Sequence, residues 1–156
     1  MATRIDGPLK RQRDVCAQVL SELPAWFGIP TAVEKYVTDA ETLPSFVAYT
    51  GERIIGILTF RVHFEQAAEI DVIGVRPECH RRGIGRALVA ALESHLRKRG
   101  VEYLQVKTLD ASAESAAYEQ TRRFFSAMGF VPLETWPTAW EPGNPCLQMV
   151  KFLQPV

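Results

Sequence analysis

The stretch Val75–Leu92 reads VRPECHRRGIGRALVAAL and contains the features that decide the fold. Gly83 and Gly85 stand directly before a run of apolar residues at helical spacing, which predicts a long helix ended by Gly100. The β-branched residues of 68–75 predict a strand immediately before the loop. A glycine loop between a strand and a helix N-terminus is typical of an anion-binding site, because the unpaired amides of the first helical turn point outward.

Positive charge in this loop supports the same interpretation. Arg81, Arg82 and Arg86 surround the two glycines, although a tight turn with solvated arginines is the alternative. Two familiar phosphate-binding loops do not fit. A Walker loop needs lysine and a hydroxyl residue directly after Gly85, and a dinucleotide-binding loop needs a third glycine where Leu88 stands. ATP and NAD are therefore not expected as ligands.

The segments on either side predict an α/β fold of the α+β type. Strands are expected at 2–5, 45–49, 53–62, 68–75, 101–108, 130–135 and 146–153, and helices at 8–23, 30–43, after Gly85 and at 113–128. The three consecutive strands between residues 45 and 75 have no helix between them that could make a parallel crossover. This excludes a doubly wound sheet and a barrel.

Composition limits the class of protein. The chain has 156 residues, 47% of them hydrophobic, which is the size and content of one domain, residues 1–156. Lysine plus arginine and aspartate plus glutamate number 18 each, so neither nucleic acid nor a membrane is an expected partner. The longest apolar run, 54–60, is too short to span a bilayer, and residues 1–14 are too polar for a signal peptide, so we expect a cytoplasmic protein. The 3 cysteines and 3 histidines show no metal-ligand spacing, and no metal is expected.

The loop resembles the acetyl-CoA loop of the GNAT superfamily of N-acetyltransferases. That pattern is Val-x-Pro, a short gap, and then Gln/Arg-x-x-Gly-x-Gly/Ala at the start of a helix, which here reads Val75-Arg76-Pro77 and His80-Arg81-Arg82-Gly83-Ile84-Gly85. The similarity is strongest from Glu69 to Phe130. It implies a mixed, mainly antiparallel sheet of six to seven strands, splayed after the fourth strand to admit acetyl-CoA, with helices on both faces.

The resemblance also implies how the cofactor, acetyl-CoA, is held. Backbone amides of 81–86 would bind the pyrophosphate, and residues 73–75 would pair with the pantetheine arm like an added strand. His80 stands where the family usually has glutamine or arginine. The expected cofactor contacts are Ile73, Gly74, Val75, His80, Arg81, Arg82, Gly83, Ile84, Gly85, Arg86 and Phe125.

Transfer to an amine needs a proton acceptor, since an alkyl ammonium must become neutral before it attacks. Glu69 matches the position of the general base in histone-type members of the superfamily. Asp71 is a second candidate or a cation-binding group, and two exposed sheet charges are the alternative. Because side chains two apart on a strand share a face, Glu69 and Asp71 are expected to project to the same side as Ile73 and Val75.

Two alternatives exist for protonation of the leaving thiolate. The superfamily commonly has a tyrosine four residues before the glycine of its Gly-Phe ending, and this chain has Phe125 there. Tyr118 lies seven residues earlier on nearly the same helical face and is the candidate donor, with packing as the alternative. A thiolate can also leave without help, because it is a much weaker base than an alkoxide.

Aromatic residues suggest where the acceptor binds. Trp26, Phe27, Tyr36, Trp136 and Trp140 come from the regions that flank the cleft in the resembling fold and could line a pocket or the core. With acidic residues nearby they favour a cationic acceptor, and we expect Trp26, Phe27 and Asp71 to contact it.

The sequence therefore predicts an acetyl-CoA-dependent N-acetyltransferase that transfers directly to a primary amine of a small molecule or peptide, with a homodimer as a possible assembly. The alternative is a non-catalytic acyl-CoA-binding or regulatory module.

Overall fold

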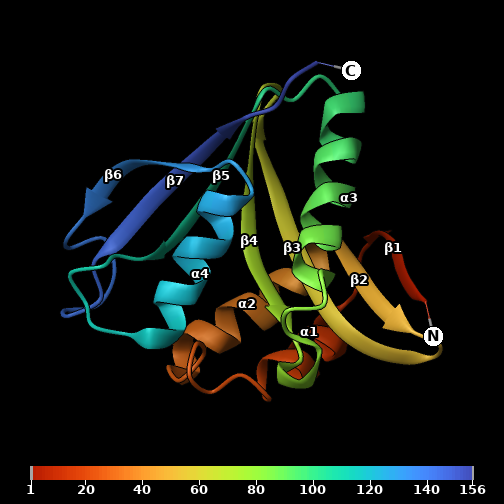
Figure 1. The fold of residues 1–156 in the computed structure, drawn as a ribbon, viewed down its shortest axis with the longest axis horizontal. Coiled ribbons are helices and arrows are strands. Elements are labelled where there is room, and N and C mark those ends of the chain that lie inside the picture. Colours follow the sequence, from red (N-terminus) through yellow and green to blue (C-terminus); the bar gives the residue numbers. More distant parts are fainter. Residues whose placement is uncertain (1, 156) are drawn as a thin grey trace.

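The computed structural model describes residues 2–155 and contains one seven-stranded sheet (Figure 1). Its elements are β1 (Thr3–Leu9), α1 (Arg13–Leu20), α2 (Pro30–Thr42), β2 (Ser45–Thr50), β3 (Arg53–Phe64), β4 (Ala67–Val75), η1 (Pro77–Cys79), α3 (Ile84–Lys98), β5 (Tyr103–Leu109), α4 (Ala116–Ala127), β6 (Val131–Trp136) and β7 (Cys146–Phe152). The strand order is β1-β2-β3-β4-β5-β7-β6, and only β4 and β5 are parallel. The predicted mixed, mainly antiparallel sheet is confirmed.

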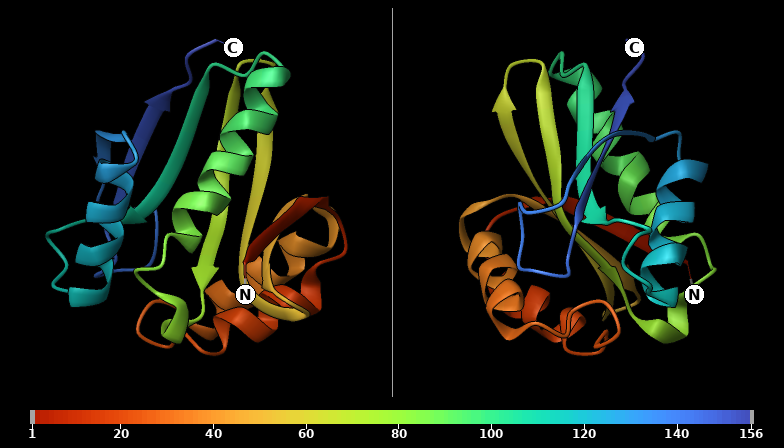
Figure 2. Two further views of the ribbon diagram at one scale, coloured as in Figure 1. Left: turned by 45° about the vertical axis from the view of Figure 1, so that its right-hand side comes forward. Right: turned by 90° about the vertical axis from the view of Figure 1, so that its left-hand side faces the viewer.

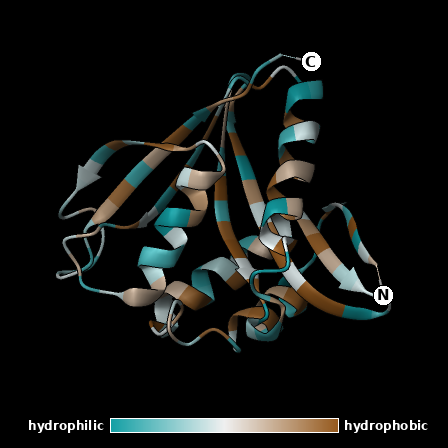
Figure 3. Cartoon of the chain, in the orientation of Figure 1, coloured by the Kyte–Doolittle hydropathy of each residue, from teal (hydrophilic) through white to brown (hydrophobic). Residues whose placement is uncertain are grey.

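Helices cover both faces of the sheet, as predicted (Figure 2). On one face α1 and α2 pack over β3 and β4 through a buried cluster that includes Val19, Leu20 and Val72. On the other face α3 buries its apolar stripe, and Leu88, Leu92 and Leu96 are fully buried. Apolar residues are dense along the central strands, whereas polar residues follow the outer faces of the helices (Figure 3).

The N-terminal segment differs from the prediction. The helix expected over 8–23 covers only Arg13–Leu20, and the strand expected over 2–5 continues to Leu9. The reason is pairing with β2, in which Asp6 lies opposite Val47 and Leu9 opposite Ser45. Sheet hydrogen bonds therefore hold this segment where local helical spacing alone favoured a helix.

The sheet opens between β4 and β5. These parallel strands pair only from Ala67 to Ile70, opposite Tyr103 to Val106. Figure 1 shows the two ribbons close together at one end and well apart at the other. The edge of β4 that faces β5 is therefore unpaired beyond Ile70, which confirms the predicted splay after the fourth strand.

A bulge in β4 corrects one expectation about side-chain direction. Thr59 of β3 pairs with Val72 and its neighbour Phe60 pairs with Ile70, so Asp71 is an extra residue in the ladder. Val72 consequently packs toward α1 and α2, while Ile73 and Val75 pack against the cluster on the α3 face. Glu69 and Asp71 therefore do not share a face with Ile73 and Val75, because the bulge reverses the alternation between them.

A buried ion pair fastens α3 to the far half of the sheet. Lys151 of β7 donates to both Glu93 carboxylate oxygens at 2.9 and 3.0 Å, and Arg97 donates to one of them at 3.1 Å. Only 5% of the Glu93 side chain is exposed. Loss of this carboxylate would leave the partly buried Lys151 ammonium uncompensated.

We therefore expect Glu93→Ala to lower the free energy of unfolding by about 3–5 kcal/mol. Chemical denaturation measures this free energy of unfolding. The matched control is Glu34→Ala, which breaks a pair with Arg13 whose side chains are 44% and 67% exposed, and which should cost less than about 1 kcal/mol. Equal losses in the two variants would contradict the role given to Glu93.

Candidate active site

A cavity of about 820 Å³ lies where β4 and β5 part. Its walls come from the segment after α1, from α2, from the open edge of β4, from the glycine loop and from α4. Of the residues expected to contact the cofactor or the acceptor or to act in catalysis, all but Arg82 and Glu69 line it. The structure thus brings together residues that are nearly 100 positions apart, from Trp26 to Phe125.

The glycine loop presents open space to the cavity. Gly83 precedes the first residue of α3 with a φ of 78°, and a Cβ built on it would meet nothing within 4 Å. Arg81 also has a positive φ, of 62°. Free helix-terminal amides beside unfilled space match the geometry that phosphate groups need.

His80 ties this loop to the end of β4. Its Nε2 lies 2.7 Å from the Val75 carbonyl oxygen. Because a carbonyl can only accept, Nε2 carries the proton and donates. The Trp26 ring packs edge-on against the imidazole, with 5.6 Å between ring centroids. His80 therefore fixes the loop through its ring.

Trp26 and Tyr118 fasten α4 across the cavity. The Tyr118 hydroxyl donates to the Trp26 carbonyl at 2.6 Å, and the Trp26 indole donates to Ala117 and Thr121 of α4 at 3.0 Å each. Burial raises the pKa of Tyr118 above its ordinary value. The hydroxyl predicted as the proton donor therefore makes a structural hydrogen bond.

Phe125 is part of the core as well as of the cavity wall. Only 1% of it is exposed, and its ring packs edge-on against Phe124 and Phe130. Phe124 in turn lies 3.2 Å from where a Cβ on Gly85 would be. Gly85 thus allows α4 to approach the first turn of α3 closely.

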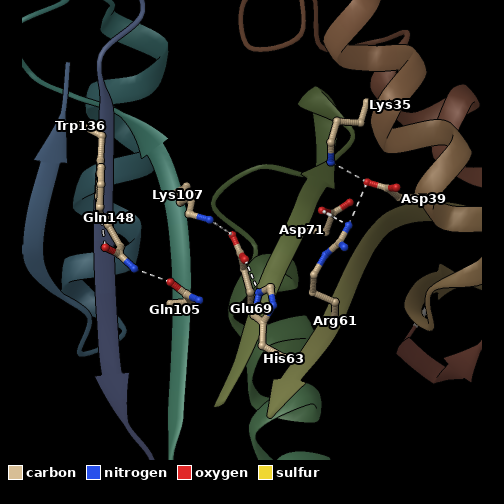
Figure 4. Close-up of polar contacts among 10 residues, drawn as sticks. All are labelled: Lys35, Asp39, Arg61, His63, Glu69, Asp71, Gln105, Lys107, Trp136 and Gln148. Carbon is tan, nitrogen blue, oxygen red and sulfur yellow. Dashed lines mark hydrogen bonds and ion pairs between the residues drawn. The ribbon is translucent and has the colours of Figure 1, made fainter. Parts of the chain in front are cut away.

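Glu69 has both carboxylate oxygens occupied (Figure 4). His63 of β3 lies 2.7 Å from one oxygen, and Lys107 of β5 lies 3.3 Å from the other. The pair with Lys107 bridges β4 and β5 at the last part of the ladder before the strands separate.

Asp71, unlike Glu69, lines the cavity. Arg61 donates to its Oδ1 at 3.3 Å, while its Oδ2 is buried and has no hydrogen-bond partner among residues 2–155. The same Arg61 donates to Asp39 of α2 at 3.2 Å, and Lys35 donates to Asp39 at 3.0 Å. Burial, followed by a hydrogen bond with the neighbouring Asp39 carboxylate and by its charge, raises the pKa of Asp71 to about 6.

Sequence reasoning missed several polar residues around these carboxylates. Arg61, His63, Lys107 and Lys35 were not singled out, although charges at the end of the apolar β3 sequence were a visible signal. Tyr36 lines the cavity, and no residue within 2–155 hydrogen-bonds its hydroxyl. Burial, with smaller contributions from Tyr118 and Asp71, raises the pKa of Tyr36 well above its usual range, so the phenol stays protonated.

Two aromatic residues named from the sequence lie elsewhere. Trp136 and Trp140 are 44% and 37% exposed and do not line the cavity. Trp136 instead donates to Gln148 across the β6–β7 pair. The cavity between β4 and β5 is therefore not lined by these two tryptophans.

We expect Gly83→Glu to abolish measurable CoA binding in calorimetry, since a carboxylate would fill the open space at the helix N-terminus and repel phosphate. Gly100→Glu is the matched control, because Gly100 has a φ of 79° and also has open space around its Cβ position, at the other end of α3. The two changes impose the same backbone strain. Equal CoA affinity in the two variants would show that the loop does not bind the cofactor.

The raised pKa of Asp71 predicts a pH-dependent cost to stability. The folded protein holds the Asp71 proton more tightly than the unfolded chain does, so protonation of Asp71 favours the folded state. This stabilisation is fully present below the unfolded pKa and is lost as pH rises through about 6. Asp71→Asn should therefore gain stability relative to the parent protein between about pH 4 and pH 6 and keep that gain at higher pH. Denaturation at several pH values measures the difference, with the exposed Asp14→Asn as control. If Asp71→Asn instead loses stability relative to the parent protein as the pH rises, the raised pKa of Asp71 is contradicted.

Comparison with known proteins gives a family match. The model of the Acetyltransferase (GNAT) family matches residues 17–130. A mycothiol acetyltransferase from Streptomyces scabiei is 33% identical over 92 residues, which are 58% of this chain and 28% of that protein. The chain thus spans much less than two thirds of the length of that relative.

Solved structures share the whole fold at low identity. The ribosomal-protein-S18-alanine N-acetyltransferase from Escherichia coli has a TM-score of 0.76 at 19% identity, covering 99% of this chain and 96% of its own. An aminoglycoside 6'-N-acetyltransferase complexed with coenzyme A has a TM-score of 0.75 at 17% identity, covering 100% and 99%.

Proposed function

Because this chain belongs to the GNAT acetyltransferase family, we propose that it transfers an acetyl group from acetyl-CoA directly to a primary amine of a small molecule or peptide. The observation that carries the proposal is the cavity at the parting of β4 and β5. It is bordered by the glycine loop on one side and by a buried carboxylate, Asp71, on the other.

The residues present fit acetyl-CoA. Open space at Gly83 and the amides of the first turn of α3 suit a pyrophosphate. The edge of β4 at residues 73–75 is unpaired toward β5 and can pair with the pantetheine amides. When bound, the cofactor supplies a thioester whose carbonyl carbon is open to attack by an amine.

The acceptor side combines aromatic rings with charge. Trp26, Phe27 and Tyr36 line the cavity together with Asp71. This combination suits an ammonium group attached to an apolar body. The two structural neighbours carry names with very different acceptors, a ribosomal protein and an aminoglycoside. The acceptor must therefore be found by experiment.

Thiol release measured with acetyl-CoA and a panel of amines tests the proposal. The panel is benzylamine, spermidine, an aminoglycoside and a peptide with a free N-terminus. We expect amine-dependent release of CoA with at least one member and an acetylated product of the matching mass. CoA binding without release for any amine would favour the non-catalytic acyl-CoA-binding or regulatory module.

For the leaving group we propose that the thiolate departs without a dedicated acid, since Tyr118 already donates to the Trp26 carbonyl. Tyr118→Phe should cost about 0.5–1.5 kcal/mol of stability through the lost hydrogen bond. Its kcat should fall by less than about tenfold. Tyr36→Phe is the matched variant, because it removes a cavity hydroxyl that no described residue binds. A larger kcat loss in a folded, CoA-binding Tyr118→Phe protein would identify Tyr118 as the acid.

Other expectations stay predictions. They are one domain over residues 1–156, a cytoplasmic location and a possible homodimer. Among residues 2–155, no helix is both long and apolar enough to cross a membrane.

A further inference from the structure

Lys107 lies at the point where β4 and β5 part. The last pair of their ladder joins Ile70 to Val106, and Lys107 is the next residue of β5. Its side chain is 41% exposed. Among residues 2–155, Lys107 is the only lysine that lines the cavity. The cavity in which we place the acetyl donor therefore has a primary amine in its own wall.

An ion pair holds this amine beside the opening. The Lys107 Nζ lies 3.3 Å from one carboxylate oxygen of Glu69, so the side chain reaches from β5 toward β4 (Figure 4). The carboxylate is itself held, because His63 lies 2.7 Å from its other oxygen and only 11% of the Glu69 side chain is exposed. The exposed part of Lys107 leaves its ammonium a path by which a proton can reach water.

The acyl end of the cofactor is expected at the same place. The glycine loop follows the carboxyl end of β4, and the free edge of that strand continues back from residues 73–75 to Ile70. A pantetheine arm that leaves the loop and pairs with 73–75 runs along this edge toward Ile70. Its thioester would then lie near the last paired residues, and Lys107 begins there.

We infer that Lys107 is a modification site, at which the protein acetylates itself from bound acetyl-CoA when no acceptor amine is present. The inference rests on the cofactor site of the proposed function and goes beyond it, because the acceptor here is part of the chain. Most lysine amines carry a proton at neutral pH, which slows their attack on a thioester. An amine fixed beside the thioester has a high effective concentration, which offsets this disadvantage.

The transfer balances without an oxidant or a reductant. The Lys107 ammonium gives one proton to water, which leaves a neutral amine with a free electron pair. The nitrogen bonds to the acetyl carbonyl carbon, the C–S bond breaks, and its electron pair leaves with sulfur. The nitrogen then loses a second proton, which ends on the thiolate. The products are CoA thiol and a neutral N-acetyl-lysine, so the ion pair with Glu69 is lost.

Lys35 provides a matched comparison within the same molecule. It also pairs with one carboxylate, that of Asp39 at 3.0 Å, but its side chain is 64% exposed and it does not line the cavity. Spontaneous acetylation by dissolved acetyl-CoA favours the more exposed amine. Faster acetylation of Lys107 than of Lys35 therefore requires a donor bound in the cavity.

The first test incubates the full chain with saturating acetyl-CoA and no amine, and follows acetylated peptides by mass spectrometry. We expect acetylation of Lys107 to approach one group per chain while Lys35 stays largely unmodified. The rate constant should not change when the protein is diluted at constant acetyl-CoA. Acetylation of Lys35 as fast as that of Lys107 would overturn the inference. A rate constant that falls on dilution would also overturn it, since transfer would then occur between molecules.

The second test needs no turnover. Acetic anhydride labels lysines without an enzyme, so its reaction with Lys107 reports how accessible that amine is. CoA without an acetyl group, at a concentration that calorimetry shows to be saturating, should slow labelling of Lys107 several-fold and leave Lys35 unaffected. Equal labelling of Lys107 with and without CoA would show that the bound arm does not reach this amine, and the inference would fail.

Two variants separate the cofactor from the acceptor. Gly83→Glu, which we expect to lose CoA binding, should lose acetylation of Lys107 and keep the slow background at Lys35. Lys107→Arg keeps the positive charge but has no neutral amine at neutral pH, so self-acetylation should stop. A CoA-binding Lys107→Arg protein that takes up as much acetyl as the parent would show that another residue is the acceptor. The two tests on the parent protein decide the matter if a variant does not fold.

The same samples distinguish this inference from the proposed function. Acetylation of an amine of the panel, with Lys107 unmodified when the amine is left out, would overturn the inference alone. Acetylation of Lys107 with no reaction of any amine of the panel would support the inference and contradict the proposed transfer to a separate amine.

Discussion

The parting of β4 from β5 after Ile70 is the constraint on which the rest of the structure depends. A parallel pair that continued would satisfy the backbone of both strands and close the sheet. Here four residues of pairing hold the strands together, and beyond them the edge of β4 is free. Helices α3 and α1 pack on opposite faces of β4, so the free edge stays in place without a neighbouring strand. The cavity exists because β5 diverges from a strand that helices hold in place on both faces.

The bulge at Asp71 makes this opening chemically asymmetric. One extra residue turns the later part of β4, so that Ile73 and Val75 pack on the α3 face. The same residue carries a carboxylate toward α2 and its charges. The main chain after the bulge thus borders the opening along the free edge of β4, while the carboxylate at the bulge points toward α2. A regular strand would have placed Asp71 on the same face as Ile73 and Val75.

Local sequence features predicted most of the fold, and features that depend on distant partners were missed. The glycine loop, the apolar stripe of α3 and the hairpins are encoded within a few residues, and they lie where expected. The extension of β1 depends on pairing with β2, and the bulge depends on the register with β3. Neither is visible in a single segment. For the same reason the sequence did not reveal the contacts of Glu69, the residue matched to the family's general base, because they come from His63 and Lys107 on two other strands.

Trp26 contacts both the glycine loop and α4 on opposite sides of the cavity. Its ring packs edge-on against His80, which hydrogen-bonds the end of β4. Its indole N–H and its carbonyl make hydrogen bonds with residues of α4. If an acceptor contacts Trp26 and the cofactor contacts His80, a ligand that moves one ring would also disturb the other. Coupling of this kind is reciprocal, so each ligand would change the affinity for the other through one shared contact, without touching it.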